Sequence, residues 1–164
     1  MNYIQQETHF HIPAHQFERV ITDCLRLPVK VAYWEQALGN IRKYYTDPRI
    51  VHSYQVSEAF ERVGQLGQCD LQITPQGVCN ISFKRLDDHY NTVPFGTGEE
   101  PFLATLAPYV EDGEFIQLLN KDTLELFRYV FHDGKLSKIF TKQVWPEVGD
   151  EEFFVEKPKL LKEP

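Results

Sequence analysis

The chain has 164 residues, of which 42% are hydrophobic and 25% are charged, and its formal net charge is −7. These values are typical of a soluble globular protein whose length fits one domain with a sizeable core. They argue against general nucleic-acid binding, because phosphate contacts need a basic surface, and no apolar run approaches the roughly 18 residues of a membrane span.

The cysteines and the N-terminus indicate the compartment. Cys24, Cys69 and Cys79 form no paired motif, which suits a reducing environment where free cysteines behave as small buried hydrophobic residues. The opening sequence MNYIQQETHF lacks the basic and apolar regions of a signal peptide. We therefore expect a cytoplasmic protein without membrane contact.

The N-terminal part is predicted to form one strand and three helices. Alternating apolar residues predict a strand over residues 4–12, with Ile4 on its buried side. A helix follows from Pro13, and its apolar stripe contains Phe17, Val20, Ile21, Cys24 and Leu25. A second helix is predicted over residues 32–44, and Ser57 is the expected N-cap of a third, short helix.

A hairpin and a loop are predicted in the middle of the chain. Residues 69–83 alternate in apolar character on two arms, with a turn at Thr74–Gly77. Cys69 and Cys79 lie on different arms but not opposite each other, so we predict no disulfide. Residues 86–98 are polar and contain proline and glycine, which indicates an exposed loop.

The C-terminal part is predicted to form a helix and three strands. The helix begins at Pro101, and Pro108 should shorten or kink its last turn. Strands follow over residues 114–119 and 124–131, and the second is apolar on both faces, so it should lie centrally in a sheet. Asp133-Gly134 predicts a type I′ turn into the last strand.

The order of the predicted elements indicates the fold class. It contains the split βαβ arrangement, βαββαβ, with helices inserted after the first helix. We therefore expect an α+β fold with one ferredoxin-like antiparallel sheet, extra helices in the N-terminal half and an appended C-terminal β-hairpin. Residues 1–146 would form this single domain, and residues 147–164 a charged tail.

Four polar side chains have a structural and a functional interpretation. His9, His11 and His15 could bind zinc or copper if the turn after the strand folded back. They match no zinc signature, so we favour exposed strand histidines and predict no metal site. Arg128 lies in the predicted central strand, where it needs a carboxylate, and a structural ion pair is favoured over a substrate clamp.

The strongest asymmetry of the sequence is electrostatic. Residues 86–120 contain seven acidic residues and no Lys or Arg. Two of the acids, Glu111 and Asp112, follow the predicted helix, where the helix dipole disfavours them. A partner that carries positive charge would explain them, and solvent-exposed charge without a partner is the favoured alternative. The predicted contact residues are the charges Asp87, Asp88, Glu99, Glu100, Glu111 and Asp112, with Tyr90 and Phe95 as aromatic anchors.

The C-terminal block FLATLAPYVEDGEFIQLLNKDTLELFRYVFHDGKL resembles a family of small uncharacterised bacterial proteins, often from mobile elements. In that family, "APYVEDGSYI" precedes a strand that ends in "WRWVFKDGK". The matching residues are Ala107, Pro108, Tyr109, Val110, Glu111, Asp112, Gly113, Ile116, Arg128, Val130, Phe131, Asp133, Gly134 and Lys135. The chain departs from the pattern at Glu114, Phe115, Phe127 and Tyr129. The resemblance implies a shared fold over most of the chain, and no activity or catalytic residue.

Three functions are consistent with these observations. We favour a non-enzymatic acidic binding protein, an inhibitor or immunity-type protein that blocks a basic partner such as a toxin or a nuclease. One alternative is a ligand-binding or dimerising ferredoxin-like module. The other is a small enzyme that uses His89 with Asp87 or Asp88, or a metal held by the three N-terminal histidines.

Overall fold

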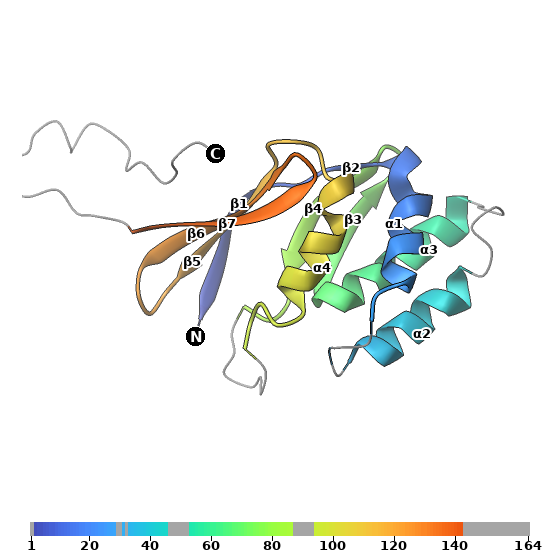
Figure 1. Ribbon diagram of the computed structural model, residues 1–164, viewed down its shortest axis with the longest axis horizontal. Helices are drawn as coiled ribbons and strands as arrows, with labels where there is room; N and C mark the ends of the chain where they lie inside the picture. The colour runs from blue at the N-terminus through green and yellow to red at the C-terminus, as the bar shows by residue number, and fades with distance from the viewer. Residues whose placement is uncertain (1, 29–30, 32, 46–52, 87–93, 143–164) are drawn as a thin grey trace, which may run out of the picture.

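The structure of the protein, a computed structural model, describes residues 2–28, 31, 33–45, 53–86 and 94–142. Within these ranges it contains two antiparallel sheets and four α-helices (Figure 1), which confirms the predicted α+β class. One continuous cluster of buried hydrophobic side chains links both sheets and the helices. None of the described helices is long and apolar enough to cross a membrane.

The first sheet has four strands in the order β1-β5-β6-β7. They are β1 (Tyr3–His9), β5 (Phe115–Asn120), β6 (Glu125–His132) and β7 (Lys135–Lys142). β6 lies inside the sheet and is buried on both faces, as predicted, through Leu126, Phe127, Tyr129, Val130 and Phe131. Asp133 and Gly134 join β6 to β7 with φ angles of 51° and 70°, which confirms the predicted type I′ turn.

The second sheet and most helices form the other part of the fold. Its order is β2-β4-β3, with β2 (Ile12–Pro13), β3 (Cys69–Thr74) and β4 (Gly77–Phe83). Beyond this sheet, α1 (Phe17–Leu25), α2 (Trp34–Tyr44) and α3 (Ser53–Val63) pack on one another (Figure 1). α4 (Glu99–Leu106) lies between the two parts and contacts both β7 and α1, and short 3₁₀ turns stand at 14–16, 64–67 and 107–109.

The prediction of a single ferredoxin-like sheet is corrected, because the predicted first strand divides between two sheets. β1 ends at His9 and pairs with β5, whereas β2 begins at Ile12 and pairs with β4. Phe10, between them, is buried in the core, so the apolar alternation continues across the break. The β3–β4 hairpin therefore never joins β5 and β6.

The Gln5 side chain bridges the two sheets. Its Nε2 donates to the carbonyl of Ile81 over 2.7 Å, and its Oε1 accepts from the backbone N–H of Phe83 over 3.0 Å. These main-chain groups stand on the edge of β4 where a further strand would pair, so a side-chain amide takes the place of a peptide group. β1 and β4 are held side by side without a shared ladder.

Three local predictions are also corrected. α3 begins at Ser53, so Ser57 lies inside the helix and not at its N-cap. Cys79 is exposed because a register shift in the β3–β4 hairpin turns Val78 inward in its place. Ile4 is 43% exposed, because the inward side chains of β1 begin at the preceding tyrosine.

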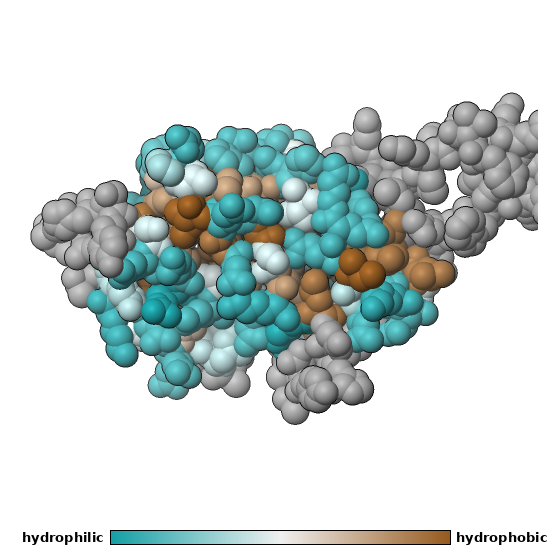
Figure 2. Space-filling model, turned by 180° about the vertical axis from the view of Figure 1, so that it is seen from behind, coloured by the Kyte–Doolittle hydropathy of each residue, from teal (hydrophilic) through white to brown (hydrophobic). Residues whose placement is uncertain are grey.

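Exposed apolar side chains gather on the four-stranded sheet. Seen from behind, the surface is mostly hydrophilic and is interrupted by separate hydrophobic patches (Figure 2). The exposed large hydrophobic residues of the described chain are Ile4, Leu124 and Phe140. All three belong to this sheet or to the turn between its strands.

Candidate functional site

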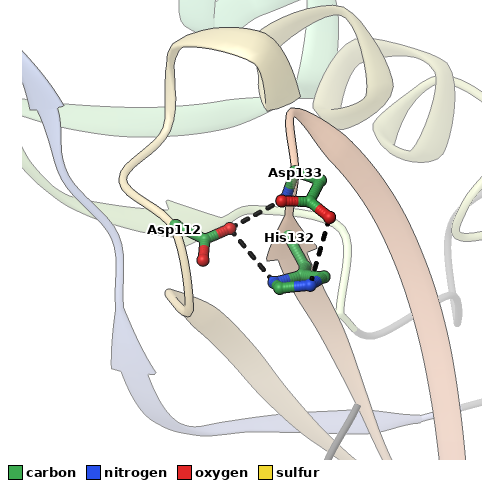
Figure 3. A group of neighbouring side chains, drawn as sticks. All are labelled: Asp112, His132 and Asp133. Atoms are coloured by element: carbon green, nitrogen blue, oxygen red, sulfur yellow. Dashed lines mark hydrogen bonds and ion pairs between the residues drawn. The ribbon is translucent and has the colours of Figure 1, made fainter.

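His132 lies between two aspartates at one end of the four-stranded sheet (Figure 3). Its Nδ1 atom is 3.1 Å from Oδ1 of Asp112, and its Nε2 atom is 3.3 Å from Oδ2 of Asp133. The backbone N–H of Asp133 donates to Oδ1 of Asp112 over 2.8 Å. The imidazole and the carboxylates therefore orient one another, although all three side chains are exposed.

Two Asp-Gly turns bring these residues together. Asp112 stands in the turn before β5, and Asp133 stands in the turn after β6. Because β5 and β6 are antiparallel, the start of one strand meets the end of the other, and the Gly113 N–H donates to the Phe131 carbonyl over 2.8 Å. Strict alternation would put Asp133 on the face opposite His132, but its left-handed backbone, with φ of 51°, returns the carboxylate to the imidazole.

A second imidazole–carboxylate pair adjoins the first. Nδ1 of His11 is 2.9 Å from Oε1 of Glu111, and the Glu111 N–H donates to the His11 carbonyl over 3.0 Å. Burial, and then the charge of Glu111, raise the pKa of Glu114, so acidic groups are crowded at this end of the sheet. We name His11, Glu111, Asp112, His132 and Asp133 the His–carboxylate edge.

Part of the His–carboxylate edge has the donor set of a metal site. One ligand atom each from Asp112, His132 and Asp133 lies within 4.8 Å of the others, and this is the one such group among the residues that the structure describes. Imidazole nitrogen and carboxylate oxygen suit zinc. His9, His11 and His15 are not gathered in this way: His9 pairs with Glu7, and His11 belongs to the edge.

The two buried cysteines are not activated nucleophiles. Burial raises the pKa of the Cys24 thiol to about 12, and burial likewise raises the pKa of Cys69, so neither is a ready thiolate. In the described parts of the chain, the imidazoles of His11 and His132 pair with carboxylates and with no hydroxyl or thiol.

The structure places the predicted contact residues in different environments, and some of them lie outside the described residues. Asp87, Asp88 and Tyr90 lie outside the described residues, as does the alternative catalytic residue His89. Glu111 and Asp112 are exposed and belong to the His–carboxylate edge. Oε1 of Glu100 lies 2.9 Å from the ammonium of Lys138.

Phe95 packs against its own chain. Its ring centroid lies 5.2 Å from that of Tyr3 and 5.5 Å from that of Phe83, and the residue is partly buried. Tyr3 belongs to the first sheet and Phe83 to the second, so the ring stands at the junction of the two sheets. The side chain takes part in internal packing, and its predicted role as an aromatic anchor for a partner stays a prediction.

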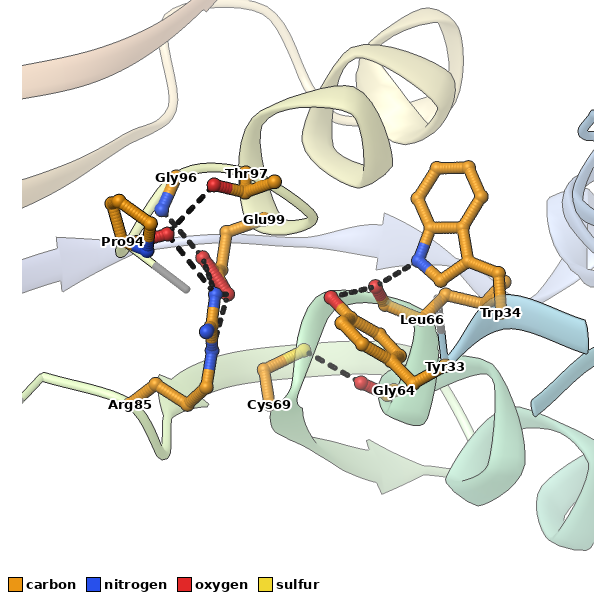
Figure 4. Close-up of polar contacts among 10 residues, drawn as sticks. All are labelled: Tyr33, Trp34, Gly64, Leu66, Cys69, Arg85, Pro94, Gly96, Thr97 and Glu99. Atoms are coloured by element: carbon orange, nitrogen blue, oxygen red, sulfur yellow. Dashed lines mark hydrogen bonds and ion pairs between the residues drawn. The ribbon is translucent and has the colours of Figure 1, made fainter. Parts of the chain in front are cut away.

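Glu99 is buried, which corrects one predicted contact. Figure 4 shows its carboxylate facing the guanidinium of Arg85. Its side chain is fully buried and accepts from Nε and Nη2 of Arg85, each over 3.0 Å, and from the Gly96 N–H over 2.6 Å. Arg85, just after β4, is also buried, so the two charges neutralise each other away from solvent. Sequence reasoning missed this pair because Arg85 stands one residue before the segment that lacks basic residues.

The direct contacts of Arg128 are an amide and an aromatic ring, whereas the sequence predicted a carboxylate. Its Nε donates to Oε1 of Gln117 over 2.7 Å, and its guanidinium lies 3.7 Å from the ring centroid of Phe115. Burial lowers the pKa of Arg128, and the negative charge of Glu7 opposes that shift. An amide and an aromatic ring are the direct contacts of Arg128 among the described residues, and the Glu7 carboxylate acts on it electrostatically.

The chain was compared with known protein families, curated proteins and solved structures. No protein-family model, curated protein or solved structure matches the chain. The resemblance of the C-terminal block to small mobile-element proteins therefore stays a prediction.

Proposed function

We propose that the chain is a non-enzymatic binding protein, of the inhibitor or immunity type, that engages a basic macromolecular partner through the His–carboxylate edge. The observation that carries this proposal is the exposure of three neighbouring carboxylates. The side chains of Glu111, Asp112 and Asp133 are 53%, 62% and 80% exposed.

The partners of these carboxylates differ from those of other acids in the fold. Glu99 pairs with Arg85, and Glu100 pairs with Lys138. Among the described residues, the ion-pair partners of the edge carboxylates are histidines and not lysine or arginine. The edge therefore keeps negative charge that a lysine or arginine of a partner would neutralise.

The arrangement also favours recognition over simple solubility. His132 and the backbone N–H of Asp133 hold the Asp112 carboxylate in one orientation before any partner arrives. Fixed carboxylates lose less conformational freedom on binding and match the forked donors of a guanidinium. Complementary charge would in addition speed the encounter with the partner.

Charge reversal tests the proposal. The partner is the basic protein that co-purifies with the wild-type chain from its native host. We expect the double variant Asp112→Lys with Asp133→Lys to bind this partner at least about tenfold more weakly, because two attractive carboxylate contacts become repulsive. Glu35→Lys with Glu61→Lys is the matched control, because it makes the same charge change on α2 and α3.

The outcome is read by titration calorimetry with the purified partner. Equal affinity of the edge variant and the control variant would refute the proposal. The same side chains could instead bind a metal, and the zinc content of the purified protein tests this. Stoichiometric zinc in the wild type that is lost in Asp112→Lys would assign Asp112, His132 and Asp133 to a metal site in place of a partner site.

A further inference from the structure

The ammonium of Lys138 lies over three aromatic rings and beside a carboxylate. Its Nζ atom is 4.9 Å from the ring centroid of Phe127, 5.1 Å from that of Phe140 and 5.7 Å from that of Tyr129. Oε1 of Glu100 accepts from the same ammonium over 2.9 Å. Aromatic faces within about 6 Å of a cation attract it, and rings combined with an acid are the usual receptor for an ammonium group.

The fold builds this arrangement from three elements. Phe127 lies opposite Phe140, and Tyr129 lies opposite Lys138, in the antiparallel register of β6 and β7. The four side chains therefore share one face of the sheet, two residues apart on each strand. Glu100 reaches them from the first turn of α4, which packs against β7.

Two features of the rings bear on the binding of a cation. Phe140 is 53% exposed on an edge strand of the described sheet, and its ring centroid lies 5.5 Å from that of Phe127. The Tyr129 hydroxyl is buried and lies beside the Glu100 carboxylate, the same group that accepts from Lys138. Burial, and then the nearby charge of Glu100, raise its pKa, so the neutral hydroxyl is retained beside the carboxylate.

Lys138 stands where an incoming group can replace it. Its side chain is 37% exposed on an edge strand of the described sheet, and because partly exposed ion pairs contribute little to stability, the rings supply most of the attraction that holds it. An open cleft of about 730 Å³ between α4 and the β6–β7 turn leads to Glu100, and Pro101, Ala104 and Leu136 supply apolar walls. Such walls suit the aliphatic stem of an incoming lysine.

We infer that Phe127, Tyr129, Phe140 and Glu100 form an ammonium cage that receives a lysine side chain of a partner, and that Lys138 fills this cage from within the chain until the partner replaces it. The inference rests on the proposed function only for the source of the lysine, a basic partner. The cage lies on other residues than the His–carboxylate edge.

Butylammonium, which has the charge and stem of a lysine side chain, is the probe. It is titrated into isotope-labelled protein, and the backbone amide resonances of β6 and β7 are followed by NMR. Lys138→Gln empties the cage and is expected to bind the probe about tenfold more tightly than the wild type. Lys138→Ala is a second variant with the same expectation.

Lys84→Gln is the matched control, because Lys84 also forms a surface ion pair, 3.1 Å from Asp70, away from the cage. It should bind the probe as weakly as the wild type. Adding Glu100→Gln to Lys138→Gln should abolish the gain. The inference is overturned if both Lys138 variants bind no more tightly than the control, or if Glu100→Gln leaves the gain intact in protein of unchanged melting temperature.

The two proposals can fail separately. The butylammonium titration needs no macromolecular partner, and Asp112→Lys with Asp133→Lys should leave it unchanged. A failed titration together with partner loss in that edge variant would refute the cage alone. Probe binding together with an edge variant that retains its partner would refute the edge alone.

Discussion

Arg85 and Glu99 carry opposite charges that are both withdrawn from water. Removing one charge of such a pair is far more costly than the loss of a surface pair, because the remaining charge stays buried. We predict that Glu99→Gln lowers the free energy of unfolding by about 3–5 kcal/mol. Urea denaturation monitored by circular dichroism measures the change.

The double variant Arg85→Met with Glu99→Leu is the control for this prediction. It removes both charges and keeps side chains of similar volume, so we expect it to recover most of the lost stability. A loss of less than about 1 kcal/mol in Glu99→Gln would be that of an exposed pair and would contradict the buried geometry.

Glu114 gives a pH dependence of known sign. Burial and the charge of Glu111 raise its pKa above the ordinary value of 4.5, so the folded state disfavours the ionised form. Its contribution to stability is therefore greatest below pH 4.5 and is lost as the pH rises through the folded-state pKa. We predict that Glu114→Gln is more stable than the wild type at pH 7, and that the difference shrinks toward pH 4.

Thermal unfolding across this pH range measures the Glu114 effect. Glu125→Gln, on the same sheet but with a carboxylate outside the crowded edge, is the matched control. A Glu114→Gln variant that is less stable than the wild type at pH 7 would show that its neighbours stabilise the carboxylate, which is incompatible with a raised pKa.

Some site residues could be predicted from the sequence, and others could not. Glu111 and Asp112 could be singled out because the dipole of the preceding helix disfavours them. The imidazole of His11 could not be predicted as the partner of Glu111, because the two residues are remote in the chain. The contact of Asp133 with His132 could not be predicted either, because the left-handed backbone of Asp133 breaks the strand alternation. The burial of Glu99 could not be predicted either, since Arg85 meets it only after β4 and α4 are packed.

At the scale of elements, the Gln5 side chain forms the hydrogen bonds that a neighbouring strand would otherwise form with the open edge of β4. Gln5→Ala leaves the Ile81 carbonyl and the Phe83 N–H without these partners in a partly buried position. We predict a loss of about 1–3 kcal/mol in the free energy of unfolding, the usual range for unsatisfied buried polar groups. Gln72→Ala, at an exposed position of β3, should change stability by less than about 0.5 kcal/mol.

Denaturant titration of the two glutamine variants separates the outcomes. Equal stabilities would mean that water replaces the Gln5 amide without cost, and that the two sheets are joined by apolar packing alone. Amide hydrogen exchange adds a local test, because the Phe83 amide should exchange faster in Gln5→Ala while amides of β6 keep their protection.

The elements with regular periodicity were predictable, but their assembly was not. The stripe of α1 and the Asp133-Gly134 turn follow from local sequence and are found as predicted. The division into two sheets depends on which strands β1 and β2 meet, and Phe10 hides the break by continuing the apolar alternation. Periodicity reports the buried face of a segment and does not report its neighbour in the sheet.

At the scale of the whole molecule, the chain carries a net charge of −7. The described carboxylates differ in how accessible they are to a partner. Glu99 and Glu100 pair within the chain with Arg85 and Lys138. The carboxylates of the His–carboxylate edge are exposed and face imidazoles. The molecule therefore presents an acidic surface at one end of its four-stranded sheet, and long-range attraction of a basic partner should depend on that end.

The association rate of the purified basic partner, measured by stopped flow at increasing ionic strength, tests this claim most directly. For the wild-type chain, the account predicts a fast rate that falls steeply as salt screens the edge. It predicts a slower rate with little salt dependence for Asp112→Lys with Asp133→Lys, and wild-type behaviour for Glu35→Lys with Glu61→Lys. Identical rates and salt dependences for all three proteins would contradict it.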